Sequence, residues 1–283
     1  MFGVRTYGRI VEHVSHAPGS DFVQSLARGL SVIRAFDGTR PELGLSEVSR
    51  ATGLTRATAR RLLLTLVRLG YVRQDGNRFS LRPRVLELGY SYLSALSLPE
   101  LAQPHMEALV SEVNESSSIA VLDDTDIVYV VRVPTSRIMS ITIAVGTRLP
   151  AYATSMGRLL LAALDRDALE DRLARMDVHA LTPTTVAHVD GLRAELDHVR
   201  SRGWAAVDQE LEQGVRSVAV PIHDASGTVC AAMNVSVHAS RMTMQDLRKQ
   251  VLPRLLRAAE AIERDLGAMA APTPRTSQLT ERT

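Results

Sequence analysis

Several residue types and features are scarce in this chain of 283 residues, and each scarcity excludes a class of protein. A single cysteine, Cys230, excludes an internal disulfide framework, and its place in the apolar run VCAAMNVSV predicts a small core residue. No apolar run approaches the length of a membrane span, and the first residues lack the apolar core of a signal peptide. We therefore expect a cytoplasmic protein that has no membrane partner.

Lysine is also nearly absent, since Lys249 is the only one, and almost every positive charge is a guanidinium. The formal net charge of +2 is unevenly spread. Residues 22–90 hold 12 arginines against 5 acidic residues, and residues 91–283 hold 19 basic against 24 acidic residues. Guanidinium groups suit bidentate contact with phosphate or guanine. The sequence thus predicts an anion-binding first segment and a mildly acidic second one, in a length that allows two domains.

Two helices are predicted before residue 54. Over residues 22–36, apolar side chains recur at helical spacing, at Leu26, Leu30, Ile33 and Phe36. After a loop, LSEVSRATG reads as a short helix with Ser46 as its N-cap and Gly53 at its end. Val48 and Ala51 are expected to face inward.

The third predicted helix, LTRATARRLLLTLVRLG, begins at an N-cap, Thr55, and ends at Gly70. Its apolar stripe consists of Ala59, Leu62, Leu63, Leu66 and Leu69. The opposite face begins with Arg56, Thr58, Arg60 and Arg61. Two helices joined by a tight glycine turn, the second with a basic N-terminal end, are typical of a helix-turn-helix.

The segment YVRQDGNRFSL predicts a hairpin, because Asp-Gly between alternating residues is a strong turn signal. Helix, helix-turn-helix and hairpin in this order predict a winged helix over residues 22–82. A basic helix alone is more often a solvated face, but the combination favours binding of double-stranded DNA, with the third helix in the major groove. The predicted DNA-contacting residues are Thr55, Arg56, Thr58, Arg60 and Arg61, with Arg73 and Arg78 beside the tip of the wing.

Residues 83–98 predict a linker helix that begins with Pro83 and ends before Pro99. One side of it is apolar, with Val85, Leu86, Tyr92, Leu93 and Leu96. This side should be buried, either against its own chain or against a second copy in a dimer, and we favour the dimer.

Residues 99–267 mix helices and strands and predict an α+β domain with one antiparallel sheet. Helices are expected at 100–115, at 155–164 and in two further stretches up to Arg202, and strands at 117–133, 138–146, 204–210 and 215–238. A terminal helix is expected to be kinked at Pro253, and residues 268–283 form a predicted disordered tail.

Two stretches of this domain could form part of a ligand site. In LPAYATSMGRLLLA, Thr154 or Ser155 caps a helix whose first amides, near Met156 and Gly157, are free for an anion. The alternative is a plain helix cap. In VCAAMNVSVH, one face is apolar, and the polar face either meets water or lines a cavity.

The stretch WAAVDQELEQGVRS could contribute to the same site or to an acid/base site. Its three carboxylates, Asp208, Glu210 and Glu212, cannot all lie in a pocket for an anion. Ser217, with Arg216 as a second candidate, is expected to face the ligand. No nucleophile, phosphate-loop or dinucleotide motif occurs, and the histidines lack metal-ligand spacing. The sequence therefore predicts no catalytic residue, metal or cofactor.

The order of these parts resembles the isocitrate-lyase-regulator (IclR) family of bacterial transcription factors. The resemblance rests on TGLTRATARRLLLTLVRLGYV, LPAYATSMGRLLLA and VDQELEQGVRSVAVPIHDASGTVCAAMNVSVHASRMT, and it runs from about Phe22 to Leu266. Within the family, these segments are most similar to the branch that responds to protocatechuate or 4-hydroxybenzoate. It implies a GAF-like effector-binding domain and a homodimer built through the DNA-binding half, often assembled into a homotetramer.

The resemblance also implies an effector site, with Ser155, Met156 and Gly157 at a helix end, Ser217, Asn234 and Ser236 as polar groups, and Ile138, Ile141 and Leu149 as an apolar wall. Arg137, Arg216 and Asp208 are further candidates. Members that bind small keto acids tend to have a cysteine where Ser217 stands and an acid where Val207 stands, which argues against a keto acid.

The leading hypothesis is a regulator that senses a small aromatic acid and controls an aromatic-degradation operon of the β-ketoadipate pathway. One alternative is an enzyme acting on a small organic acid, with a winged helix that docks a protein. A second alternative is an architectural DNA-binding protein without a ligand.

Overall fold

The computed structural model of the chain describes residues 21–89, 98–135 and 143–270. The chain divides into two compact units, Met1–Tyr92 and Leu93–Thr283. The division falls inside the predicted linker, and each unit has a hydrophobic core of its own.

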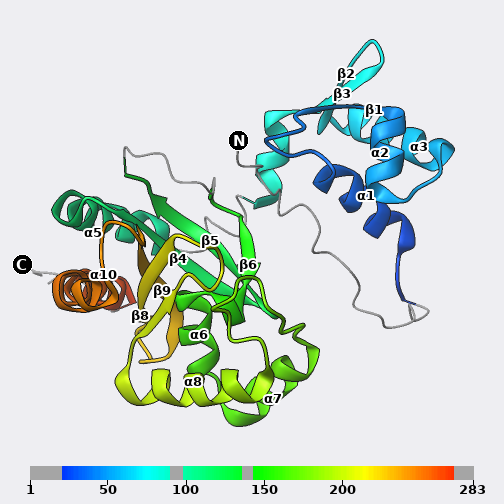
Figure 1. The fold of residues 1–283 in the computed structure, drawn as a ribbon. Helices are drawn as coiled ribbons and strands as arrows, with labels where there is room; N and C mark the ends of the chain where they lie inside the picture. The colour runs from blue at the N-terminus through cyan, green and yellow to red at the C-terminus, as the bar shows by residue number, and fades with distance from the viewer. Residues whose placement is uncertain (1–20, 90–97, 136–142, 271–283) are drawn as a thin grey trace, which may run out of the picture. The chain divides into compact units, whose positions relative to one another are not determined.

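The first unit contains helices and a small sheet in the order expected for a winged helix. Its elements are α1 (Gln24–Arg34), β1 (Glu42–Gly44), α2 (Leu45–Thr52), α3 (Arg56–Leu69), β2 (Val72–Asp75) and β3 (Arg78–Leu81), as Figure 1 shows. The strands form an antiparallel sheet in the order β1-β3-β2. The sequence did not predict β1, because three residues are too few to show an alternating pattern.

The helix-turn-helix forms where its cap residues predict it. Gly53 ends α2 with φ +67°, a left-handed conformation that a residue with a side chain rarely adopts. The Thr55 hydroxyl then accepts a hydrogen bond from the Thr58 amide and starts α3. Ala59, Leu63 and Leu66 of α3 are buried, so the predicted stripe faces the core, although Leu69 at its end is 52% exposed.

The predicted first helix is present as α1, in which Val32 is buried and Leu26 and Leu30 are exposed, and Ala35 and Phe36 after it are buried. Two details predicted for the second helix are wrong. In α2, the N-cap is Gly44 rather than Ser46, and Ala51 is exposed. The Glu47 carboxylate accepts a hydrogen bond from the Gly44 amide, which starts the helix one residue before Ser46.

The linker is described only at its start. A 3₁₀ turn covers Pro83–Leu86, and residues 87–89 continue it as α-helix. Of the predicted apolar side, Val85 is partly buried and Leu86 is 71% exposed, and Leu88, which was not assigned to that side, is 52% exposed. The predicted contacts of Tyr92, Leu93 and Leu96 lie outside the described residues.

The second unit is an α+β domain around one antiparallel sheet of six strands, in the order β6-β5-β4-β9-β8-β7. The strands are β4 (Ser116–Asp123), β5 (Asp126–Val133), β6 (Arg148–Pro150), β7 (Ala205–Asp208), β8 (Val215–His223) and β9 (Val229–His238). The longer helices are α5 (Leu98–Val113), α6 (Ser155–Ala162), α7 (Arg166–Arg175), α8 (Val189–Arg202) and α10 (Leu252–Ala270).

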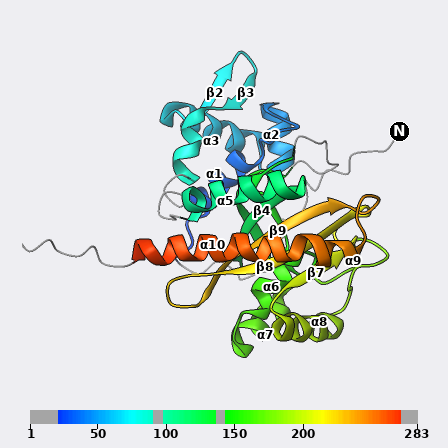
Figure 2. The ribbon, with the colours of Figure 1, turned by 90° about the vertical axis from the view of Figure 1, so that its left-hand side faces the viewer.

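Helices cover both faces of this sheet (Figures 1 and 2). One face, lined by Met233, Val235 and Val218, packs against α5 and α10. The other face, lined by Ala120, Ala219 and Ala232, packs against α6 and α8. Because side chains alternate along a strand, each strand residue belongs to one face or the other.

Several predictions for the second unit need correction. The predicted strand 138–146 lies mostly outside the described residues, and its last residues, 143–146, are not strand. Among the described residues of the second unit, the strand that follows β5 is β6. Helix α10 continues to Ala270, so the predicted tail can begin no earlier than residue 271, beyond the described part. Cys230 is exposed rather than buried in the core.

The terminal helix, which was predicted to be kinked at Pro253, is irregular just before that residue. A short helix, α9 (Met244–Asp246), leads into a π turn over Leu247–Val251, and α10 follows. Proline has no amide hydrogen to donate and crowds the preceding turn, and a π turn accommodates such a break.

Candidate functional site

The N-terminal end of α3 presents a row of free arginines. Arg56, Arg60 and Arg61 are exposed, and none forms an ion pair within the described part of the chain. Thr55 and Thr58 lie beside them, with 2.9 Å between their hydroxyl oxygens. All five residues predicted for this helix thus lie within about its first two turns, and the charge of the three arginines is available to a polyanion.

The two arginines of the hairpin differ from each other. Arg73 is 61% exposed in its side chain and reaches Glu42 only at 3.8 Å. Arg78 is held firmly: it donates to the Glu47 carboxylate at 2.7 Å and to the Glu42 carbonyl at 3.0 Å. The Gly44 amide and the Arg78 charge together lower the pKa of Glu47. Arg78 therefore ties the wing to α2, whereas Arg73 makes only the longer ion pair with Glu42 and is the more exposed of the two.

A polar patch lies on the α6 face of the second unit's sheet. Strand register places Ser118 of β4 opposite Asn234 of β9, and Ser236 of β9 opposite Ser217 of β8. Ser118, Asn234 and Ser217 are buried, and Ser236 is partly buried. Asn234 and Ser236 are joined by a hydrogen bond of 3.0 Å. The alternation in MNVSV thus separates an apolar face from this polar one.

Helix α6 meets the patch with its first residues. The Ser155 and Ser217 hydroxyl oxygens are 2.7 Å apart, and Met156 is fully buried. The cap is Thr154, which accepts from the Gly157 amide at 3.0 Å. The Gly157 amide is therefore not free for a ligand, contrary to the prediction, whereas the Ser155 and Met156 amides have no carbonyl to pair with in the helix.

The side-chain oxygen of Asn234 in this patch has no hydrogen-bond donor among the described residues. The Asn234 side chain donates to Ser236, but its oxygen, Oδ1, is buried and accepts no hydrogen bond from the described residues. Leaving such an acceptor unsatisfied costs about 1–3 kcal/mol. The residue is only 4% exposed, so bulk water does not supply the missing donor.

Arg132 of β5 is a member of the patch that the sequence reasoning missed. It pairs with Ser118 across the strands, and its guanidinium donates to the Ser118 hydroxyl at 3.2 Å. Burial lowers its pKa, and none of the described carboxylates pairs with it. The signal in the sequence is one arginine inside the apolar strand DIVYVVRV.

Two residues predicted for the site belong elsewhere. Asp208 and Arg216 face each other across β7 and β8, on the face opposite Ser217, and form an ion pair of 2.7 Å. Arg216 also donates to the Ala239 and Met242 carbonyls. It lowers the pKa of Asp208. Both are thus structural, because alternation along β8 turns Arg216 away from the side to which Ser217 points.

Of the apolar and basic residues also predicted for the site, only Leu149 lies in the described part of the chain. Leu149 is buried in the same core as Met156, beside the patch. Arg137, Ile138 and Ile141 lie outside the described residues.

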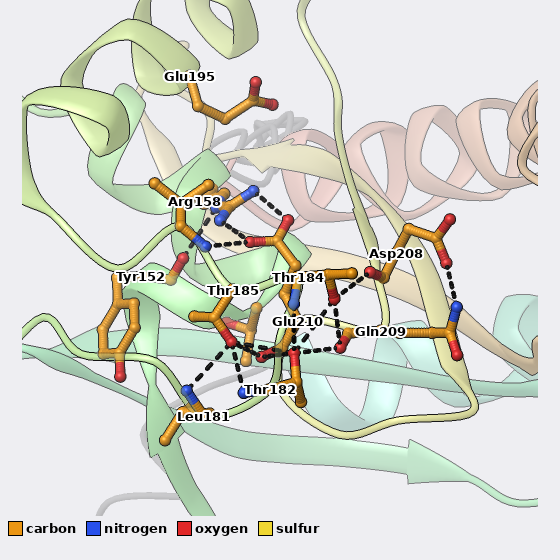
Figure 3. A network of polar contacts seen from close by, with 12 residues as sticks. Tyr152, Arg158, Leu181, Thr182, Thr184, Thr185, Glu195, Asp208, Gln209 and Glu210 are labelled. Atoms are coloured by element: carbon orange, nitrogen blue, oxygen red, sulfur yellow. Dashed lines mark hydrogen bonds and ion pairs between the residues drawn. The ribbon is translucent and has the colours of Figure 1, made fainter.

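Glu210, the second carboxylate of the run, is buried beneath α6 (Figure 3). Strand β7 ends at Asp208, and Gln209 takes φ +60°, so the three carboxylates do not share a strand face. Glu210 forms an ion pair with Arg158, and the Glu210 carbonyl accepts from Thr185 at 2.6 Å. No acid/base triad results.

Neither a metal site nor a membrane helix is found where the structure is described. No group of three or more histidine, cysteine or acidic side chains in residues 21–89, 98–135 and 143–270 could hold a metal ion. None of the described helices combines the length and apolar character that a membrane crossing requires.

Comparison with known proteins supports the architecture. Residues 25–76 match the IclR helix-turn-helix domain, and residues 90–264 match the bacterial transcriptional regulator IclR C-terminal domain. The Pca regulon regulatory protein of Pseudomonas putida is 48% identical over 240 residues, which are 84% of this chain and 82% of that protein. The p-hydroxybenzoate hydroxylase transcriptional activator of Acinetobacter baylyi is 36% identical, over 86% of this chain and 91% of that protein.

Solved structures agree with these relatives. A putative transcriptional regulator from Rhodococcus sp. RHA1 is 56% identical, with a TM-score of 0.78 over 88% of this chain and all of that one. An IclR homologue from Microbacterium hydrocarbonoxydans complexed with 4-hydroxybenzoate is 28% identical, with a TM-score of 0.76 over 86% and 99% of the two chains. Both matching families consist of transcriptional regulators, so the hypothesis of an enzyme is wrong. This chain belongs to the IclR family of bacterial transcriptional regulators, which bind DNA through a helix-turn-helix.

Proposed function

We propose that this regulator senses a small aromatic carboxylic acid and controls an operon for aromatic degradation through the β-ketoadipate pathway, in the cytoplasm. The observation that carries the proposal is the 48% identity to a Pca regulon regulatory protein over most of both chains. The structural relative complexed with 4-hydroxybenzoate supports the class of ligand. Effector binding in the second unit would shift the population of DNA-competent states.

The DNA contacts are assigned to the free end of α3. Thr55, Arg56, Thr58, Arg60 and Arg61 are placed at base edges and phosphates of the major groove, and Arg73 is placed at a phosphate beside the wing. Arg78 supports the wing from within. Each phosphate contact releases counterions and steepens the dependence of affinity on salt.

A gel shift across a salt series, on the DNA upstream of the protein's own gene, tests this assignment. We expect Arg60→Ala to weaken binding and to flatten the salt dependence. Arg257→Ala, which removes an arginine 65% exposed on α10 of the other unit, serves as the control and should leave both unchanged. If the wild-type protein binds no fragment at low salt, or if Arg56→Ala and Arg60→Ala bind like wild type, the assignment is wrong.

The effector site is assigned to the polar patch at the start of α6. Ser155 and Met156 supply amides, Ser217, Asn234 and Ser236 supply side-chain groups, and Leu149 supplies apolar contact. Aromatic acids should raise the melting temperature, because a ligand that binds only the folded state stabilises it. A thermal-shift screen with 4-hydroxybenzoate and protocatechuate tests this. Ser236→Ala should reduce the shift, and the architectural hypothesis predicts no shift with any acid.

A homodimer is assigned to the first unit and the start of the linker. In the described part of this region, seven large apolar side chains are exposed by between 44% and 71%: Phe22, Val23, Leu26, Leu30, Leu69, Leu86 and Leu88. Apolar surface of this kind marks a protein–protein contact, and a second copy of the chain brings the same apolar surface. Further pairing into a homotetramer is compatible with this arrangement.

Sedimentation at micromolar concentration tests the dimer. We expect Leu26→Glu to shift the protein toward monomer and to weaken DNA binding, because a dimer reads paired half-sites. Leu256→Glu, at an exposed leucine of α10, is the control. A wild-type protein that sediments as a monomer would contradict the proposal.

A further inference from the structure

Two groups on the α6 face of the sheet lack complementary partners, and they lie on either side of the same residue. Arg132 of β5 and Asn234 of β9 are both paired in register with Ser118 of β4. With about 4.8 Å between neighbouring strands, their backbones are roughly 10 Å apart. Both side chains project from the same face of the sheet, because residues paired in register on neighbouring strands point to the same side.

Arg132 is a cation without an anion. It forms one hydrogen bond, to the Ser118 hydroxyl, and no ion pair within the described part of the chain. A guanidinium carries five N–H donors in a planar fork that matches a carboxylate. Because partial burial destabilises the unpaired charge, a carboxylate bound to Arg132 would stabilise it more than at an exposed site.

Asn234 is an acceptor without a donor. Its amide nitrogen is used by Ser236, and the strand neighbours of Asn234 on the same face are Ser118 and Ala219. Ala219 has no donor in its side chain, and the Ser118 hydroxyl, which accepts from Arg132, makes no hydrogen bond to the Asn234 oxygen. No described residue satisfies this oxygen, so a hydroxyl or N–H group of a ligand can do so.

A single ligand that satisfies both groups must carry a carboxylate at one end and a hydrogen-bond donor at the other. Resting on the proposed function, we infer that Arg132 pairs with the effector's carboxylate and that Asn234 accepts a hydrogen bond from a ring hydroxyl. The site then selects hydroxylated aromatic acids over unsubstituted ones. The selection follows because an analogue without the hydroxyl leaves the buried Asn234 oxygen unpaired.

Calorimetric titration of the full chain with three ligands tests the inference: 4-hydroxybenzoate, 3-hydroxybenzoate and benzoate. For the wild-type protein we expect at least one hydroxybenzoate to bind about 10- to 100-fold more tightly than benzoate. This comparison alters the ligand alone and does not depend on the folding of any variant. Equal binding of all three acids would overturn the role of Asn234.

Variants then assign each end. Asn234→Leu should lower the affinity for the preferred hydroxybenzoate to that for benzoate, without weakening benzoate itself. Arg132→Gln should weaken all three acids by a similar factor, about 10- to 100-fold, and Arg132→Lys should recover part of the loss. Melting temperature and DNA affinity without ligand report whether each variant is folded.

The outcomes separate this inference from the proposed function. If the wild-type protein binds none of the aromatic acids, the proposed function is wrong. If it binds them but folded Arg132→Gln binds them equally well, the effector is an aromatic acid and only the role of Arg132 is wrong.

Discussion

Arg158 of α6 and Glu210 of the loop after β7 form a bidentate ion pair in the interior, with nitrogen–oxygen distances of 2.7 and 2.5 Å. Arg158 is 1% exposed and also donates to the Tyr152 carbonyl, while Glu210 accepts from the Val186 amide. The pair thus joins three segments around the start of α6 (Figure 3).

Breaking this pair should strongly destabilise the second unit. Glu210→Gln leaves the Arg158 charge buried without a counter-charge, and such a loss typically costs about 3–5 kcal/mol. The control is Asp190→Asn, at a carboxylate that is 92% exposed and pairs with Arg193, where about 1 kcal/mol or less is expected. Urea denaturation followed by circular dichroism measures both. Similar midpoints for the two variants would contradict the structural role of the buried pair.

Gly157→Ala should displace α6, because a Cβ at Gly157 would lie 2.2 Å from the Ala151 carbonyl oxygen and 2.3 Å from its Cα. Backbone atoms cannot rotate out of the way, so we expect a loss of stability of at least about 1–3 kcal/mol and weaker effector binding. Gly267→Ala in α10 meets no atom within 4 Å and should stabilise the helix by up to about 1 kcal/mol. Thermal melts of the two variants should therefore move in opposite directions.

Asp37 should make a pH-dependent contribution to the first unit. Hydrogen bonds from Arg40 and Thr39 lower its pKa from 3.8 to about 2. A depressed pKa stabilises the folded state above the unfolded value of 3.8, and this contribution is lost as the pH falls toward about 2. Asp37→Asn should lower the free energy of unfolding at pH 7 by no more than about 1 kcal/mol, because the pair is exposed. Urea denaturation across a pH series measures this difference, which should shrink near pH 2. A difference that grows with acidity would contradict this sign.

Cys230 should react slowly despite its exposure. Partial burial raises the pKa of its thiol, and the negative charge of Asp224 adds to this effect, so little of the reactive thiolate is present at pH 7. Because the chain has one cysteine, iodoacetamide labelling followed by mass spectrometry reports on this site alone. We expect Asp224→Asn to speed labelling at pH 7 and unfolding in guanidinium to speed it further. Rapid labelling of the native protein at pH 7 would show that the thiolate is already formed.

Local sequence signals were sufficient for the helix-turn-helix and the hairpin of the first unit, but not for strand β1. Thr55, Gly53 and the Asp-Gly turn act within a few residues of themselves, so the helix-turn-helix and the hairpin form where these signals predict them. The exposure of Leu26 and Leu30 in α1 could not be predicted in this way, because a spacing shows that a helix has an apolar side but not what covers it.

The polar patch at the start of α6 was only partly predictable. Ser155, Ser217, Asn234 and Ser236 lie together as expected, but Asp208 and Arg216 lie on the other face, and Arg132 was overlooked. Which of two alternating faces a residue takes depends on where its strand begins and on bulges such as the one opposite Ile119 in β5.

The sequence by itself determined the order of the main elements, the winged helix and the arginine-rich start of α3, because caps, turns and periodicity are local. Only the tertiary structure decided which polar groups meet. Strand pairing brings Arg132, Ser118 and Asn234 from separate parts of the chain onto one face, and the burial of Glu210 beneath α6 turns it into the partner of Arg158. Partners so distant in sequence are fixed by sheet register and packing, which no short stretch of sequence encodes.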